Sequence, residues 1–220
     1  MKKIVFTIIL ALVSLVQAGA YSFEEDGVYY RITGSNTVSV TYKDTNYNSY
    51  SGNVYVGASV RNNGILYEIT GIDSYTFYNC PDLRHINIFN SVKTIGSYAF
   101  YGCTGLTEIE LPHITIIEEH TFDGCTNLQE IGIHSTVTSY GGYAFNNCSS
   151  LTSFRIHDPV TSIGNYAFAG CSGLTKLIVG EELKTIGSYT FQGCNSITTL
   201  VWNAKNCSSM GSMQIGRAHV

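Results

Sequence analysis

Charged side chains are scarce in this sequence, making up only 13% of its 220 residues. The 12 lysine and arginine residues are scattered along the chain and form no run. Nucleic acid is therefore an unsuitable partner, because its phosphates require a concentrated basic face. The 16 tyrosines argue against a disordered chain, since disorder goes with few aromatic residues and a high net charge. Low charge with many aromatic side chains is the composition expected of a β-sheet surface.

The first 20 residues have the pattern of a signal peptide. Lys2 and Lys3 supply a positive start, and Ile4–Val16 form an apolar run too short to cross a bilayer comfortably. Small residues permit cleavage after Ala18 or Ala20. This pattern predicts a secreted or cell-surface protein with no transmembrane span in the mature chain, and an uncleaved membrane anchor is the alternative.

Residues 207–220 are interpreted as a truncated or artefactual tail. The segment QIGRAHV at its end matches the translation of a common sequencing adapter, which indicates a gene fragment fused to library sequence. A genuine tail is the alternative. Under either interpretation these residues are left out of the fold prediction.

A repeat of 22–23 residues fills the middle of the chain. The phenylalanines of one column are 23, 22, 23, 23 and 23 residues apart, and a cysteine follows each of them three residues later. The two columns contain Phe77, Phe100, Phe122, Phe145, Phe168 and Phe191, and Cys80, Cys103, Cys125, Cys148, Cys171 and Cys194. A leucine or isoleucine three residues after each cysteine opens the pattern Leu-x-x-Ile-x-Ile. Six copies predict a repeat domain over residues 69–206.

Each repeat contains the pattern of one strand and one short helical turn. The Leu-x-x-Ile-x-Ile stretch alternates at its end, as a strand with one buried face does. In the second repeat, Ala99, Phe100 and Cys103 have the spacing of the inner face of a helical turn. A glycine or asparagine two residues after each phenylalanine predicts a left-handed residue that ends the turn. Because one such unit cannot close a core alone, we expect a solenoid with a parallel β-sheet on its concave face and short helical turns opposite.

The repeats resemble a known family. VKTIGSYAFYGCTGLTEIEL and VTSIGNYAFAGCSGLTKLIV are similar to the BspA-like class of bacterial leucine-rich repeats, and the resemblance covers about Ile69–Trp202. It implies an exported or surface protein that adheres to host matrix or to other bacteria. The sequence departs from the pattern with His120 in a tyrosine column, with Tyr140 in an isoleucine column, and after Trp202, where the sixth repeat ends without a visible cap.

The segment before the repeats, residues 21–68, is predicted to form a β-rich N-terminal cap. Its stretches DGVYYRIT, YSGNVYV and NGILYEITGI also resemble members of the BspA-like class, in which this region covers the end of the repeats. The residues predict the same role, because Val28, Tyr30 and Ile32 alternate as a strand does. A solenoid end needs a cover with a polar outer side.

Seven cysteines in an exported protein raise the possibility of disulfide bridges. Six of them fall in one column, where the side chains should run parallel into the core rather than toward one another. We therefore interpret them as buried thiols that act as small hydrophobic groups, with bridging as the alternative. Cys207 lies outside the column and is the best candidate for a reactive thiol.

Residues for catalysis or metal binding are not grouped in the sequence. It contains no G-x-S-x-G, no glycine-rich phosphate loop and no H-E-x-x-H. Glu108, Glu110 and Glu130 are expected on an open sheet, whereas acid–base work on a sugar needs two carboxyls facing across a cleft. The histidines His85, His113, His120, His134 and His157 are spread over different columns, apart from His134 and His157, which should be neighbours on one rim. We predict no enzyme, no cofactor and no metal site.

The residues that flank the buried isoleucine of each strand should point outward onto the concave face. These candidate binding residues are His85, Asn87, Glu108, Glu110, Glu130, Ser153, Arg155, Lys176, Ile178, Thr199 and Val201. They change along the stack from acidic to basic and then to apolar. We predict a non-catalytic, adhesin-like binding module for a protein or glycan ligand, on host matrix or another cell surface. The alternatives are an accessory domain of a larger exported enzyme and a structural cell-envelope protein without a specific ligand.

Overall fold

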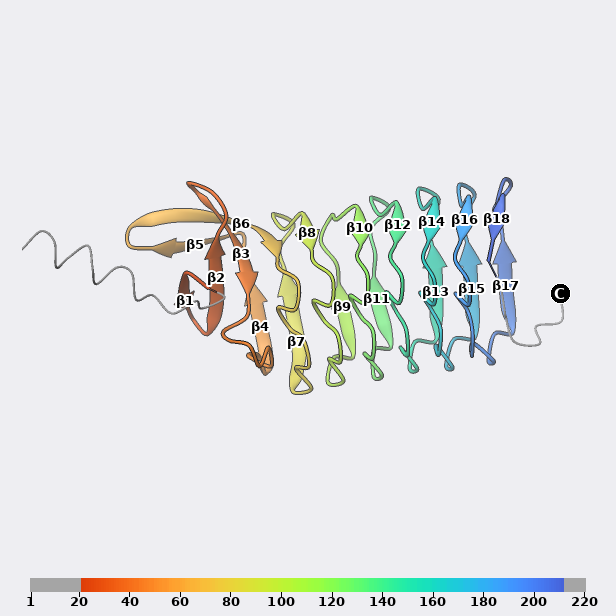
Figure 1. The fold of residues 1–220 in the computed structure, drawn as a ribbon, viewed down its shortest axis with the longest axis horizontal. Helices are drawn as coiled ribbons and strands as arrows, with labels where there is room; N and C mark the ends of the chain where they lie inside the picture. Colours follow the sequence, from red (N-terminus) through yellow and green to blue (C-terminus); the bar gives the residue numbers. More distant parts are fainter. Residues whose placement is uncertain (1–20, 212–220) are drawn as a thin grey trace, which may run out of the picture.

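The computed structural model describes residues 21–211, which form a β-rich N-terminal sheet followed by a stack of parallel rungs (Figure 1). The predicted signal peptide at residues 1–20 and the last part of the predicted tail, residues 212–220, lie outside the described residues. No helix within residues 21–211 is long and apolar enough to cross a membrane.

The N-terminal sheet combines antiparallel and parallel pairs. Its strands, in the order β1-β2-β3-β6-β5, are β1 (Phe23–Glu25), β2 (Val28–Ile32), β3 (Thr37–Thr41), β6 (Ile65–Ile72) and β5 (Ser59–Asn62). Asn63 and Gly64 connect β5 and β6 with positive φ angles of 48° and 82°, as a tight hairpin turn requires. Strand β3 pairs in parallel with β6, and the end of β6 pairs in parallel with β8 (Thr94–Ile95). The sheet is therefore joined to the first repeat by main-chain hydrogen bonds.

One face of the stack is built from the Leu-x-x-Ile-x-Ile strands. They are β7 (Leu83–Ile88), β9 (Glu108–Glu110), β11 (Glu130–Gly132), β13 (Ser153–Ile156), β15 (Lys176–Val179) and β17 (Thr199–Trp202). The pairs β9–β11, β13–β15 and β15–β17 are parallel and in register, as the repeat predicts. Strand β4 (Gly52–Val56), from the segment predicted to be the cap, pairs in parallel with β7 and adds a rung before the first repeat.

Each repeat contributes a second short strand that the sequence analysis treated only as an apolar column. These strands are β10 (Ile116–Ile117), β12 (Ser139–Tyr140), β14 (Ser162–Ile163), β16 (Thr185–Ile186) and β18 (Ser209–Met210), which form a parallel sheet of five. Strand β18 lies beyond residue 206, where the repeats were predicted to end, and continues the ladder by pairing with β16.

The prediction of short helical turns is wrong, because no segment within residues 21–211 is helical. In the second repeat, the N–H groups of Phe100 and Gly102 donate to the carbonyl oxygens of Thr121 and Asp123 in the next rung, at 2.9 and 2.8 Å. The N–H group of Tyr101, between them, donates to the carbonyl oxygen of Tyr98, three residues earlier in the same turn. Every second donor of the turn therefore joins the neighbouring rung, where a helix would use it internally.

The predicted left-handed column is confirmed. Its members have φ angles from 50° to 79° and are Asn79, Gly102, Gly124, Asn147, Gly170 and Gly193. A second left-handed column was not predicted, because its members are large side chains that rarely adopt positive φ. These residues, with φ from 55° to 63°, are Tyr75, Tyr98, His120, Tyr143, Tyr166 and Tyr189. Their rings stack with centroids 4.4–5.1 Å apart, so His120 keeps the ring stack intact between two tyrosines.

The core is a set of ladders that run along the stack. The rings of the phenylalanine column are fully buried and lie parallel, with centroids 4.9–5.5 Å apart. Tyr50 covers the N-terminal end of this column, with its ring 4.7 Å from that of Phe77. The six cysteines of the repeats are buried, and all seven cysteines are free thiols, which agrees with the interpretation of small hydrophobic groups.

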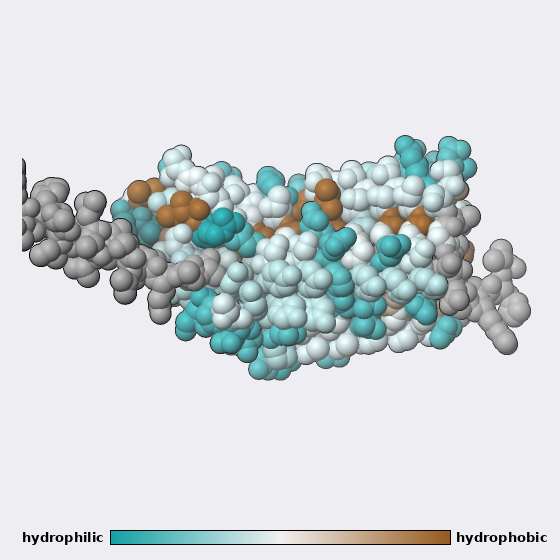
Figure 2. Space-filling model, viewed as in Figure 1, coloured by the Kyte–Doolittle hydropathy of each residue, from teal (hydrophilic) through white to brown (hydrophobic). Residues whose placement is uncertain are grey.

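The outer surface is mostly polar in the view of Figure 2. Hydrophobic side chains gather there over the β5–β6 hairpin and along the row of short strands from β10 to β16. The hairpin exposes Ile65 and Leu66, and β10 exposes Ile116. The charged groups of the candidate site belong to the other ladder of strands, which begins with β4 and in which β4 pairs with β7, β9 with β11, and β15 with both β13 and β17.

Candidate binding face

The candidate site is the outward side of strands β4, β7, β9, β11, β13, β15 and β17, which we call the sheet face. Alternation along each strand buries one side chain and exposes the next, as in β13, where Phe154 and Ile156 are buried and Ser153 and Arg155 are exposed. The parallel register then aligns the exposed positions of successive repeats. Two outward rows result, and they contain every residue that the sequence analysis proposed for binding.

The N-terminal half of the sheet face contains an acidic hollow of about 440 Å³. Glu108, Glu110 and Glu130 line it together with His85, and it has no lysine or arginine. Glu108 and Glu130 lie opposite each other in the register of β9 and β11. His85 Nε2 lies 3.6 Å from Glu108 Oε1, with both side chains more than half exposed. Because like charges at this spacing repel, the hollow favours a positively charged ligand.

Gly132 determines where the Glu110 side chain lies. A Cβ atom on Gly132 would overlap the Glu110 carboxylate, so the carboxylate occupies the space that a side chain on β11 would fill. From there Glu110 Oε1 reaches within 3.5 Å of His134 Nε2 on the rim. The His134 ring in turn packs edge-on against His113, with centroids 4.1 Å apart.

The C-terminal half of the sheet face contains a basic hollow of about 270 Å³. Arg155, Lys176 and His157 line it, and no carboxylate does. Neither Arg155 nor Lys176 forms an ion pair with any residue in the described range 21–211, so both charges are free for a ligand. Burial, together with the charge of Arg155, lowers the pKa of His157. Ile178 adds an apolar wall, while Thr199 and Val201 lie on β17 beyond the hollow.

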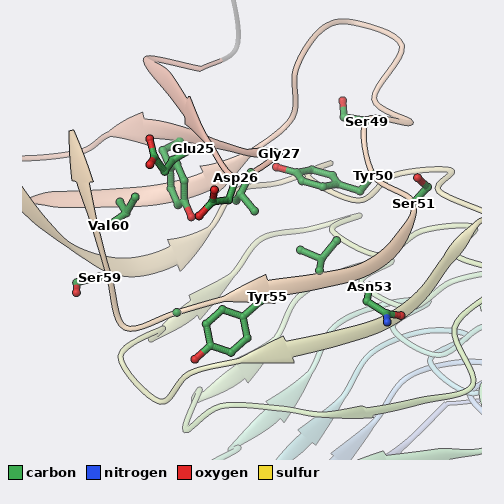
Figure 3. A pocket seen from close by; sticks show the side chains of 14 residues that line it. Glu25, Asp26, Gly27, Ser49, Tyr50, Ser51, Asn53, Tyr55, Ser59 and Val60 are labelled. Atoms are coloured by element: carbon green, nitrogen blue, oxygen red, sulfur yellow. The ribbon is translucent and has the colours of Figure 1, made fainter. Parts of the chain in front are cut away.

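A third hollow, of about 550 Å³, adjoins the acidic hollow at the N-terminal sheet (Figure 3). Glu25 and Asp26 lie on one side of it and Tyr55 of β4 lies across from them. Asn53 and Tyr55 line this cap hollow and the acidic hollow alike, so the two are continuous. Burial, with Asp26 and Glu25 nearby, raises the pKa of Tyr30 in its wall to about 12, which keeps the phenol protonated and able to donate.

The structure brings the predicted residues together in two groups. His85, Asn87, Glu108, Glu110 and Glu130 surround the acidic hollow, whereas Ser153, Arg155, Lys176 and Ile178 surround the basic one. Their role in binding stays a prediction.

The sequence analysis missed Asn53 and Tyr55, which extend both outward rows by one rung at the N-terminal end. The alternation in GNVYV was the available signal, but this segment was assigned to the cap as a whole. Tyr55 is 60% exposed, which makes it the largest apolar surface on the acidic half of the sheet face.

Groups of three or more potential metal ligands do not occur within residues 21–211. His134 is near enough to His157 to contribute to the lowering of its pKa, and it contacts Glu110 and the His113 ring. The carboxylates of the acidic hollow lie side by side on adjacent strands of one open sheet. This arrangement can bind a ligand, but it does not place two carboxyls across a reacting bond.

The repeated pair of strands, the phenylalanine ladder and the outward rows define a leucine-rich repeat protein. Residues 70–198, more than half of the chain, match six copies of the BspA type leucine rich repeat region. The chain therefore belongs to the BspA type leucine-rich repeat family, as the sequence resemblance predicted. No curated protein matches it in sequence.

Solved structures of bacterial leucine-rich repeat proteins share the fold. A leucine-rich repeat protein from Bacteroides ovatus is 25% identical with a TM-score of 0.68, over 82% of this chain and 53% of that one. A leucine rich cell surface protein from Faecalibacterium prausnitzii is 25% identical with a TM-score of 0.52, over 83% and 43%. The leucine rich repeat protein of T. pallidum is 22% identical with a TM-score of 0.60, over 80% and 90%. The chain spans about half the length of the first two.

Proposed function

We propose that this chain is a non-catalytic, exported binding module that engages a protein or glycan of another surface through its sheet face. The proposal depends on the two hollows of the sheet face, each of which is lined by charges of one sign that do not hold the fold together. Arg155 and Lys176 are unpaired within the described residues, and of the three carboxylates of the acidic hollow two contact a histidine and Glu130 has no ion-pair partner within residues 21–211. Unpaired charges of one sign on neighbouring strands do not stabilise the fold, because like charges repel.

Two further observations support an adhesin-like role at the cell surface. The repeat belongs to a family whose similar structures include a protein named as a cell surface protein in Faecalibacterium prausnitzii. Extended sheets of repeat proteins offer a long, rigid surface that suits a macromolecular partner better than a small substrate. The signal peptide predicted from residues 1–20 provides the route to the surface.

An array of extracellular matrix proteins, glycans and bacterial surface polymers tests this proposal. We expect the purified chain to bind at least one class, and the combined substitutions Glu108→Gln and Glu110→Gln, or Arg155→Gln and Lys176→Gln, to weaken that binding. Lys93→Gln with Lys184→Gln is the matched control, because both lysines are exposed beside the short-strand ladder instead of the sheet face. Binding that responds to the control pair and not to the sheet-face pairs would disprove the role of this face.

A further inference from the structure

The charges of the sheet face are separated into two halves along the stack. From the N-terminal end, Glu25 and Asp26 in the cap hollow are followed by Glu108, Glu110 and Glu130 in the acidic hollow. The two hollows together contain no lysine or arginine. The next rungs, β13 and β15, carry Arg155 and Lys176 without any carboxylate in the basic hollow.

This separation selects among the possible classes of ligand. A uniformly anionic polymer, such as a sulfated glycan, would gain from Arg155 and Lys176 but would be repelled by the acidic half only a few rungs away. A uniformly cationic ligand would be repelled at the other end. A ligand that carries both signs, each on its own segment, is attracted along the whole face.

The dimensions of the face suit an extended polypeptide. From β4 to β15 the stack has five rung spacings, or roughly 24 Å if each equals the usual separation of neighbouring strands. An extended chain that crosses the strands would cover this distance with about seven residues. Asn53 and Tyr55 belong to the first two hollows in common, and the basic hollow lies on the rungs that follow.

Tyr55 adds a contact that a cationic side chain would use. Its ring is 60% exposed and lines both the cap hollow and the acidic hollow, and Figure 3 shows it below β4, with Glu25 and Asp26 above that strand. An exposed aromatic ring next to carboxylates can bind a lysine or arginine by combined cation–π and ionic contacts. At the other end, Ile178 and the half-exposed Val201 can contact aliphatic parts of the acidic segment.

We propose that the sheet face binds an extended polypeptide segment whose basic and acidic residues are separated into two blocks. The basic block lies over the cap hollow and the acidic hollow, against Tyr55, Glu108, Glu110 and Glu130. The acidic block lies on Arg155 and Lys176. This inference rests on the proposed function and narrows its ligand from a protein or glycan to a polypeptide with separated charges.

Two synthetic peptides of about eight residues test the proposal. One carries a block of lysines followed by a block of glutamates, and the other has the same composition in alternating order. We expect the purified chain to bind the block peptide at least tenfold more tightly in fluorescence anisotropy. The preference should disappear in the Arg155→Gln/Lys176→Gln variant and in the Glu108→Gln/Glu110→Gln/Glu130→Gln variant. It should persist in the Lys93→Gln/Lys184→Gln control.

Three results would overturn the inference. One is equal affinity for the two peptides, and another is a preference that survives both sheet-face variants. The last is that the chain self-associates and that the Arg155→Gln/Lys176→Gln variant does not. The sheet face would then bind a second copy of the chain. Equal affinity for the two peptides could be accompanied by heparin binding that depends on Arg155 and Lys176. In that case the proposed function as a binding module would stand, and the inference of a polypeptide ligand would be wrong. If none of the sheet-face substitutions weakened binding to any member of the array, the proposed function itself would be rejected.

Discussion

The thiol of Cys125 donates a hydrogen bond to the main-chain carbonyl oxygen of Phe100 in the preceding rung, at a distance of 3.1 Å. The same bond recurs along the stack at 2.9–3.2 Å, from Cys103 to Phe77, from Cys148 to Phe122, from Cys171 to Phe145 and from Cys194 to Phe168. Each cysteine of this series thus fills a small core position and also ties its rung to the one before. A residue that is only hydrophobic would supply one of these two contributions.

Substitutions at Cys125 separate the two contributions. We expect Cys125→Ala to lower the free energy of unfolding by about 1–3 kcal/mol, because it removes buried volume and the bond to Phe100. Cys125→Ser should cost less, since its hydroxyl can donate to the same carbonyl. Urea unfolding followed by circular dichroism measures both. If serine costs more than alanine, the thiol acts as a hydrophobic group alone.

Alkylation should distinguish the seven thiols. Burial raises the pKa of Cys125 to about 12, and the other five cysteines of the repeat column are buried as well, so iodoacetamide should modify none of the six in the folded protein. Cys207 is half-buried, and we expect it to be modified first, though slowly because burial raises its pKa too. Mass spectrometry of native and of denatured, unreduced protein should show one and seven additions, respectively. Fewer than seven in the denatured protein would reveal a disulfide.

Tyr140 carries a buried hydroxyl that has no hydrogen-bond partner within residues 21–211. Its ring lies edge-on to Phe145, Phe154 and Phe168, with centroids 5.8–5.9 Å away, where the other repeats have smaller side chains. We expect Tyr140→Phe to raise the free energy of unfolding by about 1–3 kcal/mol, because the ring stays and the unsatisfied hydroxyl goes. Tyr143→Phe, at a half-buried ring on the surface, is the control and should change little in the same thermal unfolding experiment. A destabilised Tyr140→Phe variant would show that this hydroxyl does have a partner.

His157 should titrate at a lower pH than an unfolded histidine. Burial comes first among the causes that lower its pKa below 6.5, and the charge of Arg155 comes second. As the pH falls, the unfolded chain takes up this proton before the folded one, so the contribution of His157 to stability decreases from about pH 6.5 down to the folded pKa. Titration of the His157 ring by NMR checks the value, and Arg155→Gln should raise it part of the way. An unchanged value in that variant would exclude a contribution from Arg155.

The sequence was sufficient to predict those structural features that depend on contacts repeated in every copy of the repeat. The phenylalanine and cysteine columns, the parallel register and the left-handed position of Gly102 all follow from matched columns of one chain. The prediction of a helical turn was wrong because the spacing of Ala99, Phe100 and Cys103 indicates which side chains face inward. It does not indicate which carbonyl oxygens their N–H groups bond. The N–H groups of Ala99 and Cys103 stay within the turn, but that of Phe100 reaches the next rung, and a local periodicity contains no information about a neighbouring rung.

The candidate site, too, could be predicted only in part from the sequence. The outward rows could be read from strand alternation, and the acidic and basic order along them was visible in Glu108 and Lys176. The extension through Asn53 and Tyr55 was not, because it requires β4 to leave the N-terminal sheet and pair with β7. This pairing joins segments that have no matching sequence columns, so only the three-dimensional structure could place Tyr55 beside the acidic hollow.

The phenylalanine ladder should make the largest single contribution to stability among the repeat columns. Phe122 is fully buried, and its ring lies parallel to those of Phe100 and Phe145 at 5.2 and 5.5 Å. We expect Phe122→Ala to lower the free energy of unfolding by about 3–5 kcal/mol, because the cavity lies between two rungs that cannot close on each other while their strands stay in register. Phe122→Leu, which keeps most of the volume, should cost less than half as much in the same urea titration. If both substitutions had equal effects of under about 1 kcal/mol, the rungs would have to be held together mainly by their main-chain hydrogen bonds.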